Sequence, residues 1–322
     1  MTVDADTTDA PLVTALAGGV GAARFLAGLV RVHPPERIAV IGNTADDITI
    51  HGLHVSPDLD TVTYTLAGEI NPDTGWGLTG ESWAAMAGLR RYGGQTWFRL
   101  GDRDLGTHLY RSGRLAEGAD LATVTAEIAA AWAIGVRLLP VTNDRLRTIV
   151  TVAGEGEIGF QEYFVERRHA VVVEAVRFDG AQGSKPAAGV LEAIAEAGVV
   201  VIAPSNPIVS IGPVLSVPGV ADAVEARRPV TVAVSPIVAG AALKGPADRL
   251  LRELGHEPSV VGVARLYAPM AATLVIDEAD SALAAAVEGE GMRCVVAPTI
   301  MSDAHAAATL ARVVLDAVGS PS

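Results

Sequence analysis

The stretch of sequence that decides the fold is LVTALAGGVGAARFLAGLVRV, residues 12–32. Its apolar start, Leu12 to Leu16, predicts a buried strand, Gly18-Gly-Val-Gly21 predicts a turn, and the Ala- and Leu-rich residues 22–32 predict a helix. A second apolar run, Arg37 to Ile41, predicts the neighbouring strand. A strand, a helix and a second strand in this order are typical of a parallel sheet.

The same alternation continues along the rest of the chain. Further apolar runs predict strands at Val136 to Leu139, Val171 to Val176, Val199 to Ile202, Val230 to Val234, Thr273 to Ile276 and Cys294 to Ala297. Helices are predicted at Ala187 to Ala197, Ala247 to Leu254, Ser281 to Val287 and His305 to Val318. The predicted fold class is α/β, a Rossmann-like and mostly parallel sheet with helices on both of its faces.

One interval departs from this pattern. Residues 149–177 contain a Gly- and Glu-rich turn followed by alternating apolar residues, at Phe160, Tyr163, Phe164 and Val165, which predict antiparallel strands. We expect a small inserted antiparallel subdomain there, within a single α/β domain that covers residues 12–318. The acidic and polar residues 1–11 are expected to form a short disordered tail.

Composition and charge limit the possible partners. The formal net charge is −13, so the chain lacks the basic surface needed for non-specific binding to nucleic acid or to an anionic membrane. No apolar run is long enough to cross a membrane, and the N-terminus lacks the layout of a signal peptide. These features predict a cytoplasmic protein whose ligands are small molecules.

The glycine turn is the first candidate binding element. Gly18, Gly19 and Gly21 allow the backbone to approach a phosphate, and the N–H groups at the start of the following helix can bind it. The pattern is neither G-x-G-x-x-G nor a Walker A loop, so a tight turn without a ligand is an equal alternative.

An acidic cluster follows the second predicted strand. Asn43-Thr-Ala-Asp46-Asp47 ends that strand, and Pro57-Asp58-Leu-Asp60-Thr61 opens a predicted helix at the edge where open α/β sheets bind ligands. Carboxylates at this spacing suit Mg²⁺, which makes Asp46, Asp47, Asp58 and Asp60 candidate metal ligands. Asp58 is equally well explained as the N-cap of the helix, while a ligand role is favoured for Asp60.

Two later segments are dense in polar groups. Arg99-Leu-Gly-Asp102-Arg-Asp104-Leu-Gly-Thr107-His108 follows a short predicted strand, Thr96 to Phe98, and combines groups that grip phosphate or move protons. Ser205-Asn206-Pro-Ile-Val-Ser210 follows an apolar strand, and its side chains beside proline can form a preorganised cradle. A solvated charged turn and a structural Asx turn are the respective alternatives. Trp76 and Trp83 could wall a ring-shaped substrate or simply pack.

In this order the motifs resemble those of one enzyme family. Gly18-Gly-Val-Gly21, Asn43-Thr-Ala-Asp-Asp47, Pro57-Asp-Leu-Asp-Thr61, Leu100-Gly-Asp-Arg-Asp104 with Thr107-His108, and Ser205-Asn-Pro-Ile-Val-Ser-Ile-Gly-Pro213 are similar to the motifs of the 2-phospho-L-lactate transferases of coenzyme F-420 biosynthesis. The likeness extends from the first strand to Gly262 and is greatest with the actinobacterial phosphoenolpyruvate transferases.

The resemblance implies a reaction. The ribityl hydroxyl of the deazaflavin Fo (7,8-didemethyl-8-hydroxy-5-deazariboflavin) would attack enolpyruvyl-diphospho-5'-guanosine, giving dehydro-coenzyme F-420-0 and GMP, with Mg²⁺ as cofactor. It further implies that Asp60 and Arg99 contact the deazaflavin and serve catalysis. Gly18 to Gly21, Asn43, Ser205, Asn206 and Ser210 would then hold the guanosine diphosphate part. Some relatives have Lys where this chain has Arg99, which keeps the charge but alters the hydrogen-bond geometry.

Other readings remain open from the sequence. The donor could carry lactate or glycerate instead of enolpyruvate. A non-catalytic nucleotide-sugar-binding regulator has a similar glycine turn but would not need the two acidic motifs. A nicotinamide dehydrogenase would need G-x-G-x-x-G after the first strand, which is absent. A homodimer is expected because twofold assemblies are common.

Overall fold

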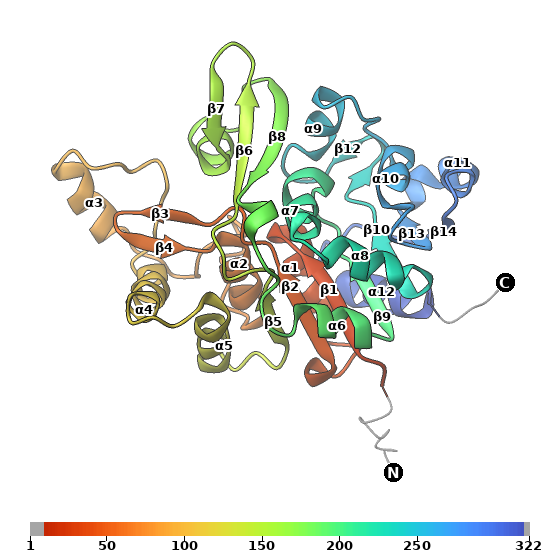
Figure 1. Ribbon diagram of the computed structural model, residues 1–322, viewed down its shortest axis with the longest axis horizontal. Coiled ribbons are helices and arrows are strands. Elements are labelled where there is room, and N and C mark those ends of the chain that lie inside the picture. The colour runs from red at the N-terminus through yellow and green to blue at the C-terminus, as the bar shows by residue number, and fades with distance from the viewer. Residues whose placement is uncertain (1–9, 319–322) are drawn as a thin grey trace.

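The structure is a computed structural model that describes residues 10–318, and its centre is a seven-stranded parallel sheet (Figure 1). The order across the sheet is β14-β13-β10-β9-β1-β2-β5, and every neighbouring pair is parallel. Its strands are β1 (Val13–Ala17), β2 (Ile38–Gly42), β5 (Arg137–Pro140), β9 (Val199–Ile202), β10 (Thr231–Val234), β13 (Thr273–Ile276) and β14 (Arg293–Val296). The predicted α/β fold class is confirmed, and the predicted boundaries of these strands agree with the observed ones to within one residue.

The strand order reverses beside β1. From β1 the chain proceeds through β2 to β5 on one side, whereas β9, β10, β13 and β14 extend on the other side. Ligands of open parallel sheets bind outside the carboxyl ends of the strands at such a reversal. The loops after β1 and β9 therefore lie where a binding site is expected.

Helices cover both faces of the sheet, because the strand side chains are apolar on both of its faces. On one face α1, α2 and α12 pack with Ala15, Val40 and Val201, and on the other α6, α8 and α10 pack with Leu16, Ile41 and Val200. The helices are α1 (Gly19–Leu29), α2 (Pro57–Leu66), α3 (Ala84–Arg91), α4 (Asp104–Ala116), α5 (Leu121–Ala131), α6 (Val190–Glu196), α7 (Gly212–Ser216), α8 (Val220–Ala226), α9 (Ala247–Glu253), α10 (Val260–Tyr267), α11 (Ala284–Gly289) and α12 (Ala304–Asp316).

Three small antiparallel sheets are attached to this frame. One consists of β7 (Gly156–Gly159), β6 (Arg147–Val152) and β8 (Val173–Asp179), and it projects at the top of Figure 1. The others pair β3 (Ile48–Ile50) with β4 (Leu53–Val55), and β11 (Ile237–Val238) with β12 (Ala241–Ala242). Antiparallel strands were predicted in the first of these regions, although the strand predicted at Val171 to Val176 belongs to this small sheet.

The predicted strand character of Phe160, Tyr163, Phe164 and Val165 is wrong. A π-helical turn spans Glu162–Glu166, and the Phe160 and Phe164 rings stack at 5.4 Å. Their spacing of three and four residues is the spacing of a helical face, which the short window did not distinguish from alternation. A second π-helical turn spans Pro207–Ile211, and short 3-10 turns occur at Pro35–Arg37, Ala181–Gly183, Arg228–Val230 and Glu278–Leu283.

Three further boundaries differ from prediction. Helix α1 begins at Gly19, so Gly18 alone separates β1 from α1, and Gly19 to Gly21 of the predicted turn form the start of the helix. Thr96–Phe98 is not a strand, because it has no neighbouring strand and the Trp97 and Phe98 rings pack edge to face in a small cluster. Of the predicted tail, residues 1–9 lie outside the described residues, while the carbonyls of Ala10 and Pro11 are bonded by Arg37 and His33.

Across residues 10–318, we find no single helix long and apolar enough to span a membrane. One bent pair, Pro207–Ser216 with Val220–Ala226 at 97°, reaches the required length and composition.

Candidate active site

A cavity of about 620 Å³ lies outside the carboxyl ends of the parallel strands. Its walls come from the loops after β1, β2, β9, β10 and β14, so it occupies the point where the strand order reverses. Most of the residues predicted from the sequence converge on it. Those that line it are Gly18, Gly19, Gly21, Asp46, Asp58, Asp60, Arg99, Asp104, His108, Ser205, Asn206 and Ser210.

The glycine turn and the Ser205 loop are locked together. The Ser205 hydroxyl donates to the Gly18 carbonyl at 2.7 Å, and a Cβ on Gly18 would lie 2.8 Å from Cβ of Ser210. Asn206 uses its side-chain oxygen to accept from the amides of Ile208 and Val209, at 2.9 and 3.3 Å. The loop therefore presents a fixed surface, because its polar side chains are already committed to holding its shape.

Asp46 and Asp58 form the acidic wall of the cavity, and neither has a cationic partner among residues 10–318. Both are buried, and Asn43 donates to Asp58 at 2.9 Å while Thr148 donates to Asp46 at 3.2 Å. Burial, reinforced by the charge of Asp58, raises the pKa of Asp46 well above its ordinary value. Burial raises the pKa of Asp58 to about 6. Buried carboxylates whose charged forms are disfavoured in this way make a site that a cation would stabilise.

The alternative role of Asp58 as a helix N-cap is wrong. Ser56 occupies the cap position of α2, and Asp58 lies in the first turn, where it accepts from the amide of Gly19 as well as from Asn43. Asn43 is fully buried behind the cavity wall and does not line it. It acts on the cavity by orienting Asp58.

Asp60 is engaged in a different way. The guanidinium of Arg111, a residue 1% exposed, bonds both of its carboxylate oxygens, Nη1 to Oδ2 at 3.1 Å and Nη2 to Oδ1. Nδ1 of His108 lies 3.4 Å from the same Nη1 and 3.7 Å from Oδ2 of Asp60. A bidentate pair of this kind fixes the plane of the carboxylate and neutralises its charge.

The network continues behind His108. Nε2 of His108 lies 3.2 Å from Oδ1 of Asp104, and the Tyr64 hydroxyl donates to the same oxygen at 2.6 Å. Although burial acts to raise it, the adjacent His108 ring and the hydrogen bond from Tyr64 hold the pKa of Asp104 below its ordinary value. Asp60 and Asp104 are thus joined through His108 into one buried polar network on α2 and α4.

Three predicted site residues lie elsewhere. Asp47 accepts from His54 at 2.9 Å and from Ser56 at 2.8 Å, which ties the β3–β4 hairpin to α2. Asp102 accepts from the Ser82 hydroxyl and from the amides of Ala84 and Ala85, so it caps the start of α3. Thr107 is buried beside the Tyr64 hydroxyl and does not line the cavity.

Arg99 and several aromatic side chains contribute to the lining of the cavity. The Arg99 guanidinium lies 3.9 Å from the ring centroid of Trp83, a cation–π contact that leaves its N–H groups available. Trp76, Trp97, Phe98, Phe160 and Phe164 line the cavity. Flat apolar side chains with a cation at the edge suit a conjugated ring that carries polar groups.

Several lining residues were missed by the sequence analysis. They are Arg24, Tyr64, Gln161, Lys244, Thr299 and Ser302, and Arg111 behind the wall was missed as well. Thr299 and Ser302 follow β14, so the rule that ligands lie beyond strand carboxyl ends could have found them. Arg111 carried no such signal, because an arginine on an amphipathic helix is normally solvated.

Two of the four predicted metal ligands, Asp46 and Asp58, could bind a magnesium ion. No group of three or more His, Cys, Asp or Glu side chains within residues 10–318 is arranged to hold a metal. Asp46 and Asp58 nevertheless supply two hard oxygen donors without a cation of their own, and Mg²⁺ usually takes one or two carboxylates and fills its other positions with water and phosphate oxygens. Both oxygens of Asp60 are already bonded by Arg111.

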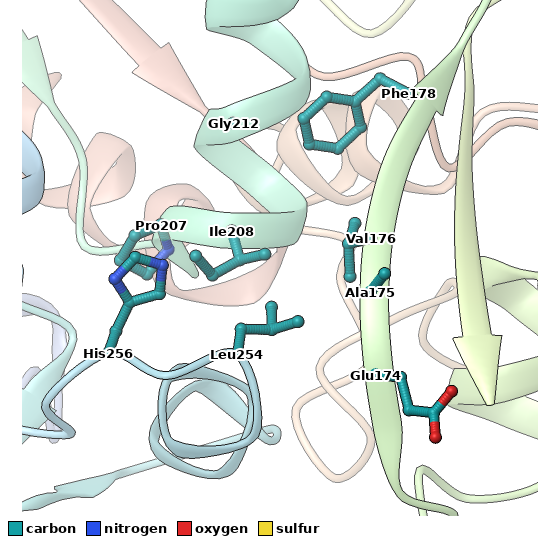
Figure 2. A pocket seen from close by; sticks show the side chains of 9 residues that line it. All are labelled: Glu174, Ala175, Val176, Phe178, Pro207, Ile208, Gly212, Leu254 and His256. Atoms are coloured by element: carbon teal, nitrogen blue, oxygen red, sulfur yellow. The ribbon is translucent and has the colours of Figure 1, made fainter. Parts of the chain in front are cut away.

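A second hollow of about 430 Å³ separates β8 from the segment that begins at Pro207 (Figure 2). Val176, Phe178, Ile208 and Leu254 make it mainly apolar, and the Phe178 ring faces the helix at Gly212. Its polar side chains, Glu174 and His256, extend from different elements and do not converge. It lacks the grouped polar residues of the larger cavity.

A parallel sheet whose reversal point holds a cavity walled by glycine amides, paired carboxylates and arginine defines an α/β protein of the class that binds phosphorylated small molecules. Comparison with known families is specific. The chain belongs to the family described as 2-phospho-L-lactate transferase CofD, whose profile matches residues 13–311.

Similar proteins extend over nearly the whole chain. A phosphoenolpyruvate transferase of Kitasatospora aureofaciens is 48% identical over 309 residues, which are 94% of this chain and 96% of that protein. The phosphoenolpyruvate transferase of Mycolicibacterium smegmatis is 39% identical over 327 residues, 95% and 98% of the two chains. A crystal structure of a UPF0052 family protein from Bacillus halodurans has a TM-score of 0.61 at 18% identity, covering 94% of this chain and 98% of that one, and shows the fold alone.

Proposed function

We propose that the chain is a phosphoenolpyruvate transferase of coenzyme F-420 biosynthesis. It transfers the enolpyruvyl-phosphate group from enolpyruvyl-diphospho-5'-guanosine to the deazaflavin Fo, giving dehydro-coenzyme F-420-0 and GMP. The observation that carries the proposal is the convergence of the family's motifs on one cavity, in a chain up to 48% identical to phosphoenolpyruvate transferases.

The cavity divides into parts that match two substrates. Arg99 and the aromatic side chains suit the flat deazaflavin, and Asp60 lines the same cavity. The Gly18 turn and the Ser205 loop suit the guanosine diphosphate part, because they present backbone at the start of α1. Each substrate therefore has a wall of suitable chemistry.

Transfer forms one bond and breaks one. The acceptor hydroxyl oxygen bonds the distal phosphorus, the bond from that phosphorus to the bridging oxygen breaks, GMP leaves with the electron pair, and the hydroxyl proton is released. Such a reaction needs positioning and charge neutralisation more than a protein nucleophile. The fixed Gly18 and Ser205 surfaces and the anchored Asp60 provide the positioning.

Mg²⁺ belongs to the same proposal. Asp46 and Asp58 would hold it, and the bound ion would neutralise charge on the phosphate oxygens. Asn43 would keep Asp58 turned toward it, since its amide is bonded to that carboxylate. The preference given to Asp60 from the sequence thereby moves to Asp46 and Asp58.

The test is direct. Purified protein is incubated with Mg²⁺, Fo and either the enolpyruvyl or the lactyl guanosine diphosphate, and GMP and the deazaflavin product are measured by mass spectrometry. GMP from the enolpyruvyl donor is expected, and Arg99→Ala should lower the rate. GMP from the lactyl donor alone would make the chain a 2-phospho-L-lactate transferase.

The second candidate is a nucleotide-sugar-binding regulator without activity. Absence of GMP with every donor, in protein that binds GDP, would favour it. The buried Asp60–Arg111–His108–Asp104 network weighs against it, because a binder does not need a buried network that fixes the orientation of Asp60. We also expect a cytoplasmic homodimer, and light scattering measures the oligomeric state.

A further inference from the structure

We propose that Arg24 and Lys244 form a two-cation clamp for the diphosphate group of the donor nucleotide. The two residues are far apart in the sequence, and the sequence motifs include neither of them. The identity of the nucleotide rests on the proposed function, whereas the anion site itself rests on the geometry of the cavity.

The two side chains lie near the same face of α1. Val20 and Arg24 are four residues apart on this helix, so they share a face. A Cβ built on Gly75 would lie 2.8 Å from Nζ of Lys244 and 3.3 Å from Cγ1 of Val20. Lys244 therefore reaches the helix face that carries Arg24, and both residues line the cavity.

Neither cation has a carboxylate partner among residues 10–318. Nζ of Lys244 donates to the backbone carbonyl of Thr74 at 2.9 Å, and Arg24 is exposed at the cavity wall. Burial and the neighbouring charge of Arg24 lower the pKa of Lys244. The chain has 37 acidic and 24 basic residues, so most cations can find a carboxylate partner. Two neighbouring cations that pair with no carboxylate in the described structure can instead bind an anionic ligand.

The position of the pair selects the kind of anion. Arg24 lies one helical turn beyond Gly21, next to the amides at the start of α1, and the acidic wall of Asp46 and Asp58 lines the same cavity. A ligand that reaches both groups needs more than one negative charge. One charged group would face Arg24 and Lys244, and another would share a metal ion with Asp46 and Asp58. A diphosphate meets this requirement.

Lys244 can hold the anion without leaving Thr74. An ammonium group has three N–H donors, so one bond to the Thr74 carbonyl leaves two for phosphate oxygens. The segment around Thr74 and Trp76 is thereby attached to the cation that binds the ligand. Occupation of the clamp should steady this segment over the cavity.

The experiment measures binding to the full-length protein by calorimetry, with GDP, GMP and uncharged guanosine as probes. Arg24→Met and Lys244→Met should each weaken GDP binding about tenfold or more, since each removes charged hydrogen bonds, and should leave guanosine binding unchanged. Arg31→Met is the matched control, because Arg31 is an exposed arginine just beyond the end of α1 and does not line the cavity. It should bind GDP within about twofold of the parent.

The outcomes separate the clamp from the transfer reaction. GDP affinity unchanged in both variants, with intact circular dichroism, would overturn the clamp, as would equal losses for GDP and guanosine. Unchanged GDP affinity with a raised KM for the complete donor would assign the cations to the carboxylate of the three-carbon acid, against the proposal. If the parent releases no GMP from any donor but GDP binding still depends on both cations, the clamp stands and the transfer function fails.

Discussion

The carboxylate of Asp60 is held on both oxygens by the guanidinium of Arg111, and both residues are buried. The pair joins α2 to α4 across the back of the cavity. Because of this ion pair, we interpret Asp60 as a carboxylate of fixed orientation and not as a free metal ligand. The cost of burying Arg111 is offset only while Asp60 remains its partner.

Replacement of Arg111 by Met should therefore lower both stability and activity. Loss of one partner of a buried ion pair costs about 3–5 kcal/mol, and loss of the group that orients a functional side chain costs about 10- to 100-fold in activity. Urea unfolding gives the first quantity and steady-state kinetics the second. Arg114→Met is the control, because Arg114 lies on the same helix but pairs with Glu117 and Glu127 away from the cavity.

A double-mutant cycle separates positioning from a general loss of stability. If Arg111 acts through Asp60, the Arg111→Met change should have little further effect on kcat/KM in the Asp60→Asn background. Additive losses in the double variant would contradict the positioning role. An Asp60→Asn protein with normal activity would instead remove Asp60 from the mechanism altogether.

The sequence predicts the frame of the site better than its interior. Gly18, Asp58 and Ser205 were predicted as neighbours because each follows or opens an element at the carboxyl edge of a parallel sheet, and edge position depends only on strand order. Arg111 and Lys244 could not be predicted in this way. Their roles depend on which side chain lies opposite them, and that is decided by tertiary packing.

The Leu100-Gly-Asp-Arg-Asp104 motif shows the same limit within five residues. Asp104 faces the cavity, whereas Asp102 turns away to cap α3, and Glu81 accepts from the amides of Arg103 and Asp104 in return. A Cβ on Gly101 would overlap the Glu81 carboxylate. Much of the motif therefore holds the N-termini of α3 and α4 together, and its residue types alone do not predict this role.

Magnesium binding should depend on Asp58 and Asp46 and not on Asp60. In the parent protein, Mg²⁺ added to chelator-treated sample should raise Tm, because it binds the folded state. Asp46→Asn and Asp58→Asn should lose this shift, whereas Asp60→Asn should retain it, as judged by differential scanning fluorimetry. A shift that survives in Asp58→Asn and disappears in Asp60→Asn would restore the assignment made from the sequence.

The same acidic pair predicts an unusual dependence of stability on pH. The pKa of Asp58 is about 6 in the folded state and lower when unfolded, so the folded state binds the proton more tightly and loses stability as pH rises from about 4 to about 6. The loss is on the order of 3 kcal/mol for a shift of this size. Asp58→Asn in metal-free buffer should therefore become more stable relative to the parent at pH 8 than at pH 4, measured by urea unfolding.

Asp303 offers a control of opposite sign for that measurement. Its carboxylate caps α12 by accepting from the amides of His305 and Ala306, and these bonds lower its pKa. Asp303→Asn should therefore lose stability relative to the parent as pH rises through the acidic range. A parallel pH response of the Asp58 and Asp303 variants would contradict the raised pKa of Asp58.

Gly21 should be the most sensitive glycine of the turn. It lies in the first turn of α1, where a Cβ would overlap the carbonyl oxygen of Pro204 in the loop after β9. Backbone on both sides prevents relief by a side-chain rotation, so Gly21→Ala should cost about 1–3 kcal/mol and shift the two loops that frame the cavity, lowering turnover as well. Gly106→Ala is the matched control, because nothing beyond its chain neighbours and the backbone of α4 lies within 4 Å of its built Cβ in the described structure, and alanine there should add about 0.5–1 kcal/mol. Parental stability and turnover in Gly21→Ala would mean that the close approach of α1 to Pro204 is not required for the site.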